Sequence, residues 1–403
     1  MLLDRGTQVV AGVAVVAILA RTLGTEGFAA FQYAQSLVFL GASVALVCGG
    51  EVVIPRLVAL ADDAASQHRL LVHVFRLRFR AALGGYALVI GILLATRQPL
   101  QNWWAALVLA GSILLREPFG VVIAWMQSRT ETRPGVCINV ASLALKLGVV
   151  SGLAYWNVHV TPAYAAAFLL EAVMASGLLC LLYRHRMPRH RLKCDPDLTR
   201  ALLRDGALFW ISFMLMMGAR RIDQLILHAH VGASEFAAYA ATVQIVDNFT
   251  ALAAILASGI APLYVYARPN AGAAVRSVLK LAVFLFVVGL AGAIVLALLA
   301  PWIVHLLYGS AFKDAIALLR LAILVSPLMF ADVGFTILAA YLREPRWIAI
   351  KWGIACVATV VVDLIAIPEL GARGAILGYA VSSVLAVLAG AGMWLHARRR
   401  HAS

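Results

Sequence analysis

The chain has 403 residues, of which 63% are hydrophobic and only 13% are charged, and its mean hydropathy is +0.92. A soluble domain carries roughly 25% charged residues, so this composition excludes a soluble globular fold. The net charge of +14 comes from 33 lysines and arginines, but these do not form the basic stripe with interleaved aromatics that is typical of nucleic-acid binding. The composition therefore predicts an all-α polytopic membrane protein.

Twelve stretches of the chain are long and apolar enough to span a bilayer as helices, which takes about 20 residues each. In chain order they cover residues 6–22, 28–48, 80–96, 103–126, 137–155, 162–183, 207–229, 236–262, 280–300, 316–341, 347–367 and 374–396. Asp4 and Arg5 shorten the first stretch, so the exact extent of helix 1 stays open. Gly374 and Gly378 form a small-x-x-x-small pattern, which predicts close packing of the last helix against a neighbour.

The basic residues are divided unevenly between the predicted loops. With the N-terminus in the cytoplasm, the inside segments carry 24 lysines and arginines and the outside loops carry 4. Basic loops of membrane proteins face the cytoplasm, so both termini are predicted to be cytoplasmic.

A short sequence occurs twice, about half the chain apart. Residues 23–31 read LGTEGFAAF and residues 231–239 read VGASEFAAY, and each copy lies just before the second helix of a set of six. Six helices return the chain to the same side, so the two sets share one orientation, as in parallel repeats. This pattern predicts two six-helix lobes, residues 1–183 and 207–403, joined by a basic cytoplasmic linker, residues 184–206.

The loops and motifs argue against an enzyme. The predicted outside loops are short, whereas membrane-embedded transferases and polymerases place catalytic groups on longer ones. The sequence contains no phosphate-binding G-x-x-x-x-G-K-[ST] loop, no H-E-x-x-H and no C-x-x-C, so neither a cofactor nor a metal site is predicted. We therefore expect a carrier.

Eleven ionisable residues lie well within the predicted spans, away from their ends, where each costs roughly 2.5–3.5 kcal/mol at a helix centre. Facing lipid they would not be tolerated, so they are expected to pair or to line a wet cavity. The candidate substrate-binding cations are Arg116, Lys146, Arg220, Arg221 and Arg320. The candidate ion-pair or coupling acids are Glu117, Glu171, Asp223, Asp247, Asp332 and Asp363.

Spacing suggests which of these charges pair locally. Arg220 and Asp223 lie three residues apart on one helix face, and Arg116 adjoins Glu117, so each couple could be a simple ion pair. Lys146 and Arg221 have no obvious local acid, which favours a cavity that binds an anionic head group such as a phosphate or diphosphate. The acids could carry a coupling proton or sodium ion, although balancing the cations is the simpler role.

Four segments resemble the polysaccharide flippases of the multidrug/oligosaccharidyl-lipid/polysaccharide exporter (MOP) superfamily. In order they are ILARTLGTEGFAAFQYAQSLV, RRIDQLILHAHVGASEFAAYAAT, HLLYGSAFKDAIALLRL and IPELGARGAILGYAVSS, and together they extend over nearly the whole chain. The resemblance makes Asp223 the aspartate of a family motif and Gly24, Gly232 and Gly309 turn glycines of outside loops. Ala29 departs from the pattern, which usually has glycine there.

The resemblance implies two six-helix lobes around a central cavity, which rock by alternating access and transport the substrate without chemistry. The expected substrate is an undecaprenyl-diphosphate-linked oligosaccharide, moved from the inner to the outer leaflet of the bacterial inner membrane for O-antigen, capsule or exopolysaccharide assembly. Expected partners are this lipid, membrane lipids, and the polymerase and chain-length machinery. A multidrug or cation exporter of the same superfamily is one alternative, although it would favour an acid-dominated cavity. A peptidoglycan-precursor flippase is another, although such proteins typically have two further helices.

Overall fold

The computed structural model describes residues 2–98, 100–187, 195–268, 270–342 and 344–400. Residues 188–194 of the predicted linker therefore lie outside the described part. Within these ranges the chain is helical with no β-strand, and eleven helical stretches are long and apolar enough to cross a membrane. The first stretch holds two helices joined across a kink, so the prediction of about twelve membrane helices is confirmed.

The kink lies at Gly24, between the first two predicted spans. Its φ of 66° belongs to the left-handed region that glycine adopts without a steric penalty, and Gly309 shares this property with a φ of 84°. Both glycines thus have the turn role that the resemblance implied. Gly232 also lies in a turn, between α7 and α8, but its φ of −72° and ψ of 161° are open to any residue. The expectation that Gly232 is needed for backbone shape is wrong.

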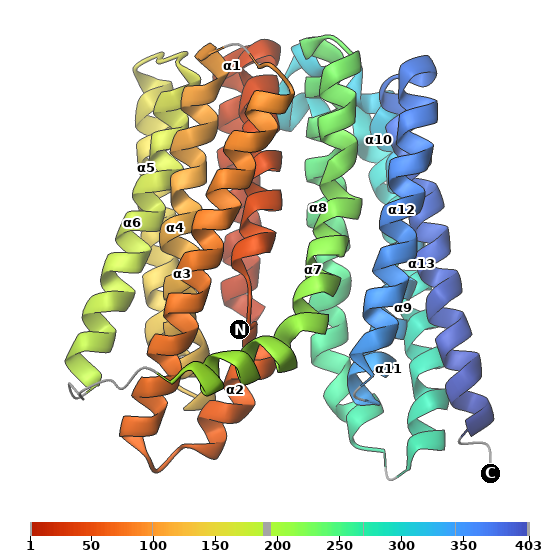
Figure 1. Cartoon of the computed structure of the whole chain (residues 1–403). Coiled ribbons are helices and arrows are strands. Elements are labelled where there is room, and N and C mark those ends of the chain that lie inside the picture. Colours follow the sequence, from red (N-terminus) through yellow and green to blue (C-terminus); the bar gives the residue numbers. More distant parts are fainter. Residues whose placement is uncertain (1, 99, 188–194, 269, 343, 401–403) are drawn as a thin grey trace. The chain divides into compact units, whose positions relative to one another are not determined.

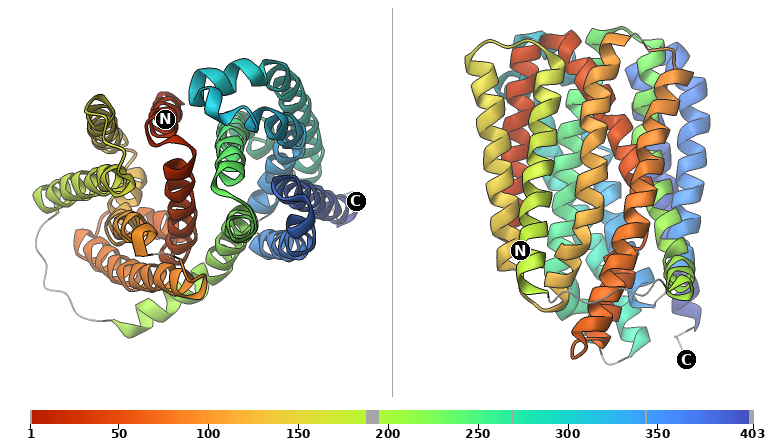
Figure 2. Two further views of the ribbon diagram at one scale, coloured as in Figure 1. Left: turned by 90° about the horizontal axis from the view of Figure 1, so that it is seen from above. Right: turned by 60° about the vertical axis from the view of Figure 1, so that its left-hand side comes forward.

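The chain divides into two compact units, residues 1–217 and 218–403 (Figures 1 and 2). The first unit contains α1 (Leu2–Ala45), α2 (Gly50–Ala59), α3 (Ala64–Ala95), α4 (Leu100–Ser128), α5 (Arg133–Tyr155), α6 (Thr161–Arg186) and the beginning of α7 (Pro196–His230). The beginning of α7 runs across one end of this unit at a steep angle to the other helices (Figure 1). It contributes the fully buried Leu202 to a core around Trp125.

The second unit contains the remainder of α7 and six further helices. They are α8 (Ala233–Ala261), α9 (Ala271–Tyr308), α10 (Ala315–Ile323), α11 (Ser326–Tyr341), α12 (Pro345–Leu370) and α13 (Ala372–Arg400), with one π-helical turn at Pro262–Tyr266 and one 3₁₀ turn at Ser310–Phe312. The core of this unit is apolar and is centred on Phe330, Leu285 and Leu338.

Three segments differ from the predicted spans. The predicted basic loop before residue 80 is largely helical, because Leu70, Leu71 and Val74 of α3 pack into the core of the first unit. α7 starts at Pro196, inside the predicted linker. The predicted helix 316–341 consists of α10 and α11, and the second begins just before Pro327, whose missing N–H suits a first helical turn.

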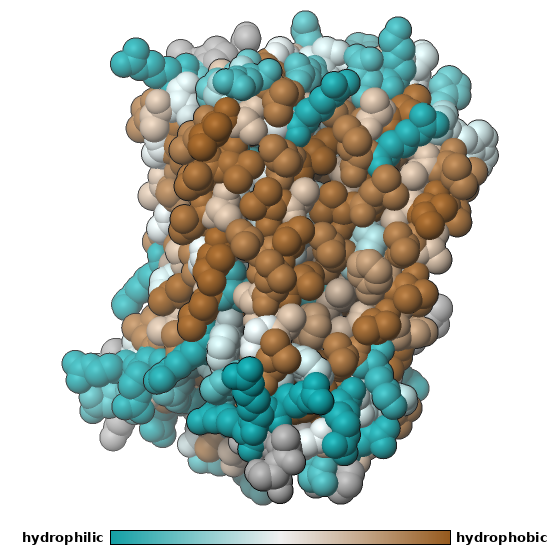
Figure 3. All heavy atoms as spheres, turned by 90° about the vertical axis from the view of Figure 1, so that its right-hand side faces the viewer, coloured by the Kyte–Doolittle hydropathy of each residue, from teal (hydrophilic) through white to brown (hydrophobic). Residues whose placement is uncertain are grey.

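The second unit carries an apolar belt. Figure 3 shows a broad hydrophobic band bordered by hydrophilic atoms at both ends. Large exposed residues of this unit include Leu298 on α9, Val357 and Ile365 on α12, and Leu388 on α13. Exposed apolar area of this extent is stable in a bilayer and not in water, which supports a membrane-spanning orientation.

The backbone of α12 packs closely against Gly374 of α13. A Cβ at this position would lie 2.5 Å from the carbonyl oxygen of Ala366, which is backbone and cannot move aside easily. We expect Gly374→Ala to lower the free energy of unfolding by about 1–3 kcal/mol, the usual cost of overpacking, as measured by thermal unfolding in detergent. Gly392→Ala on the same helix is the control, because a Cβ there meets nothing within 4 Å. Equal effects of the two substitutions would contradict the packing role.

Candidate functional site

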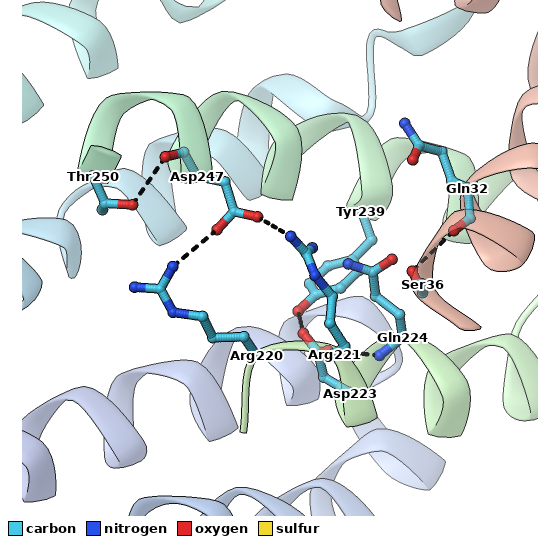
Figure 4. A network of polar contacts seen from close by, with 9 residues as sticks. All are labelled: Gln32, Ser36, Arg220, Arg221, Asp223, Gln224, Tyr239, Asp247 and Thr250. Carbon is cyan, nitrogen blue, oxygen red and sulfur yellow. Dashed lines mark hydrogen bonds and ion pairs between the residues drawn. The ribbon is translucent and has the colours of Figure 1, made fainter. Parts of the chain in front are cut away.

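Two consecutive arginines of the second unit share one carboxylate. Arg220 and Arg221 project from α7, and both reach Asp247 of α8 (Figure 4). Arg221 Nη2 donates to Asp247 Oδ2 over 2.6 Å, whereas Arg220 Nη1 lies 3.9 Å from Asp247 Oδ1. Arg220 Nε is buried and has no hydrogen-bond acceptor among the described residues. Arg220 therefore retains donor capacity for a ligand.

Asp223 binds a phenol, and the predicted ion pair with Arg220 is wrong. Its carboxylate accepts a short hydrogen bond from the Tyr239 hydroxyl on α8 and another from the backbone N–H of Gln224 over 2.7 Å (Figure 4). An arginine placed before its acid on a helix is the weaker orientation of such a pair. The packing of α8 along α7 offers each group a better partner.

The sequence that occurs twice contains an indication of the contact between Asp223 and Tyr239. Tyr239 corresponds to Phe31 in the first copy, and by the same alignment Asp223 corresponds to Val15. Phe31 and Val15 are buried apolar residues, with exposures of 0% and 1%. The second copy thus replaces an apolar pair by an acid and a phenol, a change that marks a polar site.

A small cavity of about 40 Å³ lies among these side chains, with room for a few water molecules. Its polar lining consists of Arg220, Asp223, Tyr239, Asp247, Thr250, Thr359 and Tyr379. Every one of these residues belongs to the second unit.

Asp363 of α12 is the most deeply buried acid of this region. Its exposure is 0%, and neither carboxylate oxygen has a hydrogen-bond partner among the described residues. Oδ1 rests against Gly378 of α13, where a Cβ would lie only 1.9 Å away. We call Arg220, Arg221, Asp223, Asp247 and Asp363 the C-terminal cluster.

A second charged group lies within the first unit. Lys146 Nζ on α5 is 2.8 Å from Glu171 Oε2 on α6, and both side chains are buried. Arg116 on α4 approaches the other oxygen of Glu171 at 3.8 Å, with 66% of its side chain exposed. Lys146 also lies over the Phe168 ring, 4.7 Å from its centroid. We call Arg116, Lys146 and Glu171 the N-terminal cluster, which has two cations for one acid.

The local pairings expected in this region are corrected by the structure. Arg116 pairs with Glu171 instead of Glu117, because consecutive residues of a helix point about 100° apart. Lys146 and Arg221 were assigned to a ligand because neither has an obvious local acid, and the structure gives each an acidic partner on an adjacent helix. The reasoning that assigned these two cations to a ligand by their isolation therefore fails.

Two further predicted residues lie apart from both clusters. Arg320 of α10 is exposed and donates through Nε to the carbonyl oxygen of Ala297 over 3.3 Å. Asp332 of α11 forms a buried ion pair with Lys351, whose Nζ lies 2.8 Å from each carboxylate oxygen and 2.8 Å from Thr336 Oγ1. Lys351 lies near the start of the predicted span 347–367 and was not among the candidate intramembrane cations, yet it is buried on α12 with an exposure of 5%.

Arg78 is a buried cation that hydropathy alone did not single out. It donates to the carbonyl oxygens of Val47 and Cys48, over 3.2 and 2.8 Å, where α1 gives way to α2, and to that of Glu117 over 3.3 Å. Broken helices inside a membrane need such donors for their freed carbonyls. Arg78 is therefore structural.

The comparison with family models finds a match to the family described as "Polysaccharide biosynthesis protein" over residues 104–317, more than half of the chain. A comparison with curated proteins finds no match.

Solved structures of MOP transporters share the fold. An inward-facing multidrug resistance MATE family transporter of the MOP superfamily superposes with a TM-score of 0.72 at 16% identity and covers 99% of both chains. The lipid II flippase MurJ in an inward closed conformation gives 0.76 at 12% identity over 98% of this chain and 89% of MurJ. A MOP superfamily transporter from Pyrococcus furiosus, titled for the reverse polarity of its binding pocket, gives 0.64 at 16% over 100% and 94%. With the family match, these likenesses identify the chain as a member of the polysaccharide biosynthesis protein family, a flippase family with the MOP superfamily fold.

Proposed function

We propose that the protein moves an undecaprenyl-diphosphate-linked oligosaccharide from the inner to the outer leaflet of the bacterial inner membrane by alternating access. The observation that carries the proposal is the N-terminal cluster, which holds two cations for one acid inside an apolar unit of a polysaccharide biosynthesis family member, together with the unused donor of Arg220 in the C-terminal cluster. One solved relative by fold is titled a flippase of lipid II, which supports a substrate with a lipid-borne head group. The product would supply O-antigen, capsule or exopolysaccharide assembly, with a polymerase and chain-length machinery as partners.

We assign phosphate recognition to the two arginines whose distances to a carboxylate are long. Arg116 and Arg220 lie 3.8 and 3.9 Å from their carboxylates, beyond normal hydrogen-bond length. Guanidinium groups bind phosphate oxygens through two parallel N–H bonds, so each arginine can exchange its weak contact for a stronger one. Lys146 and Arg221 make close contacts with acids, and we assign them the role of holding those acids in place.

Asp363 is the best candidate to couple transport to an ion gradient. A charged carboxylate is costly to bury without a partner, so this one is expected to hold a proton or a sodium ion in the resting protein. Asp223 lines the small cavity, and so does Thr359, which lies one helical turn before Asp363 on α12, so the cavity gives the ion a polar route.

The membrane orientation follows from the loop charges. Both termini are placed in the cytoplasm by the excess of basic residues in the loops on that side. This orientation puts the basic end of α13, Arg398–Arg400, beside the inner leaflet, where the substrate is assembled.

The test replaces Arg116 with alanine. We expect Arg116→Ala to weaken binding of the diphosphate lipid by about 10- to 100-fold, the range for a charge-assisted contact to phosphate, while stability changes little because the side chain is mostly exposed. Binding to the purified protein in lipid nanodiscs is measured by native mass spectrometry, and export by labelling lipid-linked sugars at the outer leaflet of intact cells.

Arg346→Ala is the matched control, because Arg346 is an exposed cation at the start of α12, away from both clusters. Cells that lack the protein should accumulate lipid-linked repeat units in the inner leaflet. Unchanged surface polysaccharide in those cells would disprove the proposed function, and export of cationic drugs instead would favour the multidrug alternative.

A further inference from the structure

Two glutamines in the second half of α1 have buried amide atoms without partners. Gln32 is 5% exposed, and its Nε2 has no acceptor among the described residues. Gln35 Oε1, one turn along the same helix, is buried and has no donor within the same part of the chain. The Ser36 hydroxyl donates to the backbone carbonyl of Gln32 over 2.9 Å and leaves the side-chain amide unused (Figure 4). Each such group costs about 1–3 kcal/mol unless a ligand satisfies it.

Two contacts fix the register of α1 against α6. A Cβ on Gly27 would lie 3.5 Å from Thr161 Oγ1, and the rings of Phe31 and Phe168 are 5.2 Å apart. Both helices therefore run in the same direction from a common level. Gln35 lies four residues after Phe31, and a helix rises 1.5 Å per residue. The amide is thus one turn deeper than the paired rings and on nearly the same helix face.

The same register brings Gln35 to the depth of the N-terminal cluster. Glu171 lies three residues after Phe168 on α6 and is held by Lys146, which rests on the Phe168 ring. Gln32 is three residues from Gln35 and projects from an adjacent part of the same side of α1. The unpartnered donor Gln32 Nε2 and the unpartnered acceptor Gln35 Oε1 thus lie at the level of the cations of the first unit.

The chemistry of the two atoms selects their ligand. Nε2 can only donate and Oε1 can only accept, and a hydroxyl does both. A phosphate has only acceptor oxygens at neutral pH and would be repelled by Oε1. An apolar or cationic drug would leave Nε2 unsatisfied. Sugar hydroxyls are the group that satisfies both atoms together.

We propose that Gln32 and Gln35 form a subsite for the hydroxyl groups of the first sugar of the substrate, beside the phosphate-binding Arg116. This inference rests on the proposed function. It adds a site that recognises the hydroxyl groups of the sugar and not the charge of the phosphate.

The experiment compares two probes on the purified protein in lipid nanodiscs, undecaprenyl diphosphate with no sugar and the native lipid-linked repeat unit. Wild type should bind the glycosylated lipid more tightly. Gln32→Met and Gln35→Met keep the side-chain length, and each should reduce that preference about tenfold, the value of one hydrogen bond, while binding of the bare lipid stays unchanged. Both variants should melt at or above the wild-type temperature, because each removes an unsatisfied buried group.

Gln127→Met on α4 is the control, because Gln127 is exposed and should change neither measurement. An unaltered sugar preference in both α1 variants would overturn the subsite. A lower melting temperature together with loss of binding to both lipids would also overturn it, because the amides would then stabilise the fold and not bind the sugar. If wild type bound neither lipid, the proposed function would fail together with the subsite. If it bound both lipids equally, only the subsite would fail.

Discussion

Lys351→Ala is expected to lower the free energy of unfolding by about 3–5 kcal/mol, because it leaves the carboxylate of Asp332 buried without its cation. Asp332 is 2% exposed and depends on Lys351 for bonds to both of its oxygens. Thr336 can offer only a hydroxyl in exchange. Thermal and denaturant unfolding in detergent, followed by tryptophan fluorescence, measures the loss.

Two comparisons separate this buried pair from an ordinary surface charge. Arg400→Ala breaks the exposed contact with Glu344 and should cost less than about 1 kcal/mol. The double variant Lys351→Met with Asp332→Leu should recover most of the lost stability, because well-packed apolar residues often replace a buried ion pair without cost. A single Lys351→Ala variant no less stable than Arg400→Ala would show that water or another cation reaches Asp332.

Asp363→Asn is expected to reduce gradient-driven translocation to the rate seen without a gradient. The amide cannot take up and release a proton or attract a cation, yet it has nearly the same size as the acid and fits against Gly378. Because the wild-type carboxylate is buried with no partner among the described residues, its neutral replacement should fold at least as well. Flipping of the native lipid-linked repeat unit is measured in vesicles under imposed proton or sodium gradients.

The control for this variant is Asp62→Asn, which neutralises an exposed acid between α2 and α3. It should flip the lipid at the wild-type rate with either gradient. Stimulation of Asp363→Asn by a gradient to the wild-type level would exclude Asp363 as the coupling group. Loss of the response to only one of the two ions would identify the coupling ion.

The charged residues show where tertiary structure overrides local spacing. The sequence marked Lys146, Glu171, Arg221 and Asp247 as costly in a membrane, and all four are paired. The sequence could not identify the partner of each residue, because each partner lies on another helix. Which residues meet depends on the rotation and the register of the two helices against each other. The i,i+3 pattern predicted Arg220 with Asp223, and the packing of α8 overrode it.

The sequence by itself determined the membrane class, the twelve helices and the family, because a bilayer imposes a length and an apolar character that local composition records directly. It also identified Asp363 as an intramembrane acid. Only the tertiary structure decided that Asp363 is buried without a hydrogen-bonding partner among the described residues, that Lys351 pairs with Asp332, and that Gln32 and Gln35 carry unsatisfied amide atoms. Each of these features depends on whether two helices make a contact at that position. Such contacts follow from helix register and rotation, which are set by packing across the whole unit.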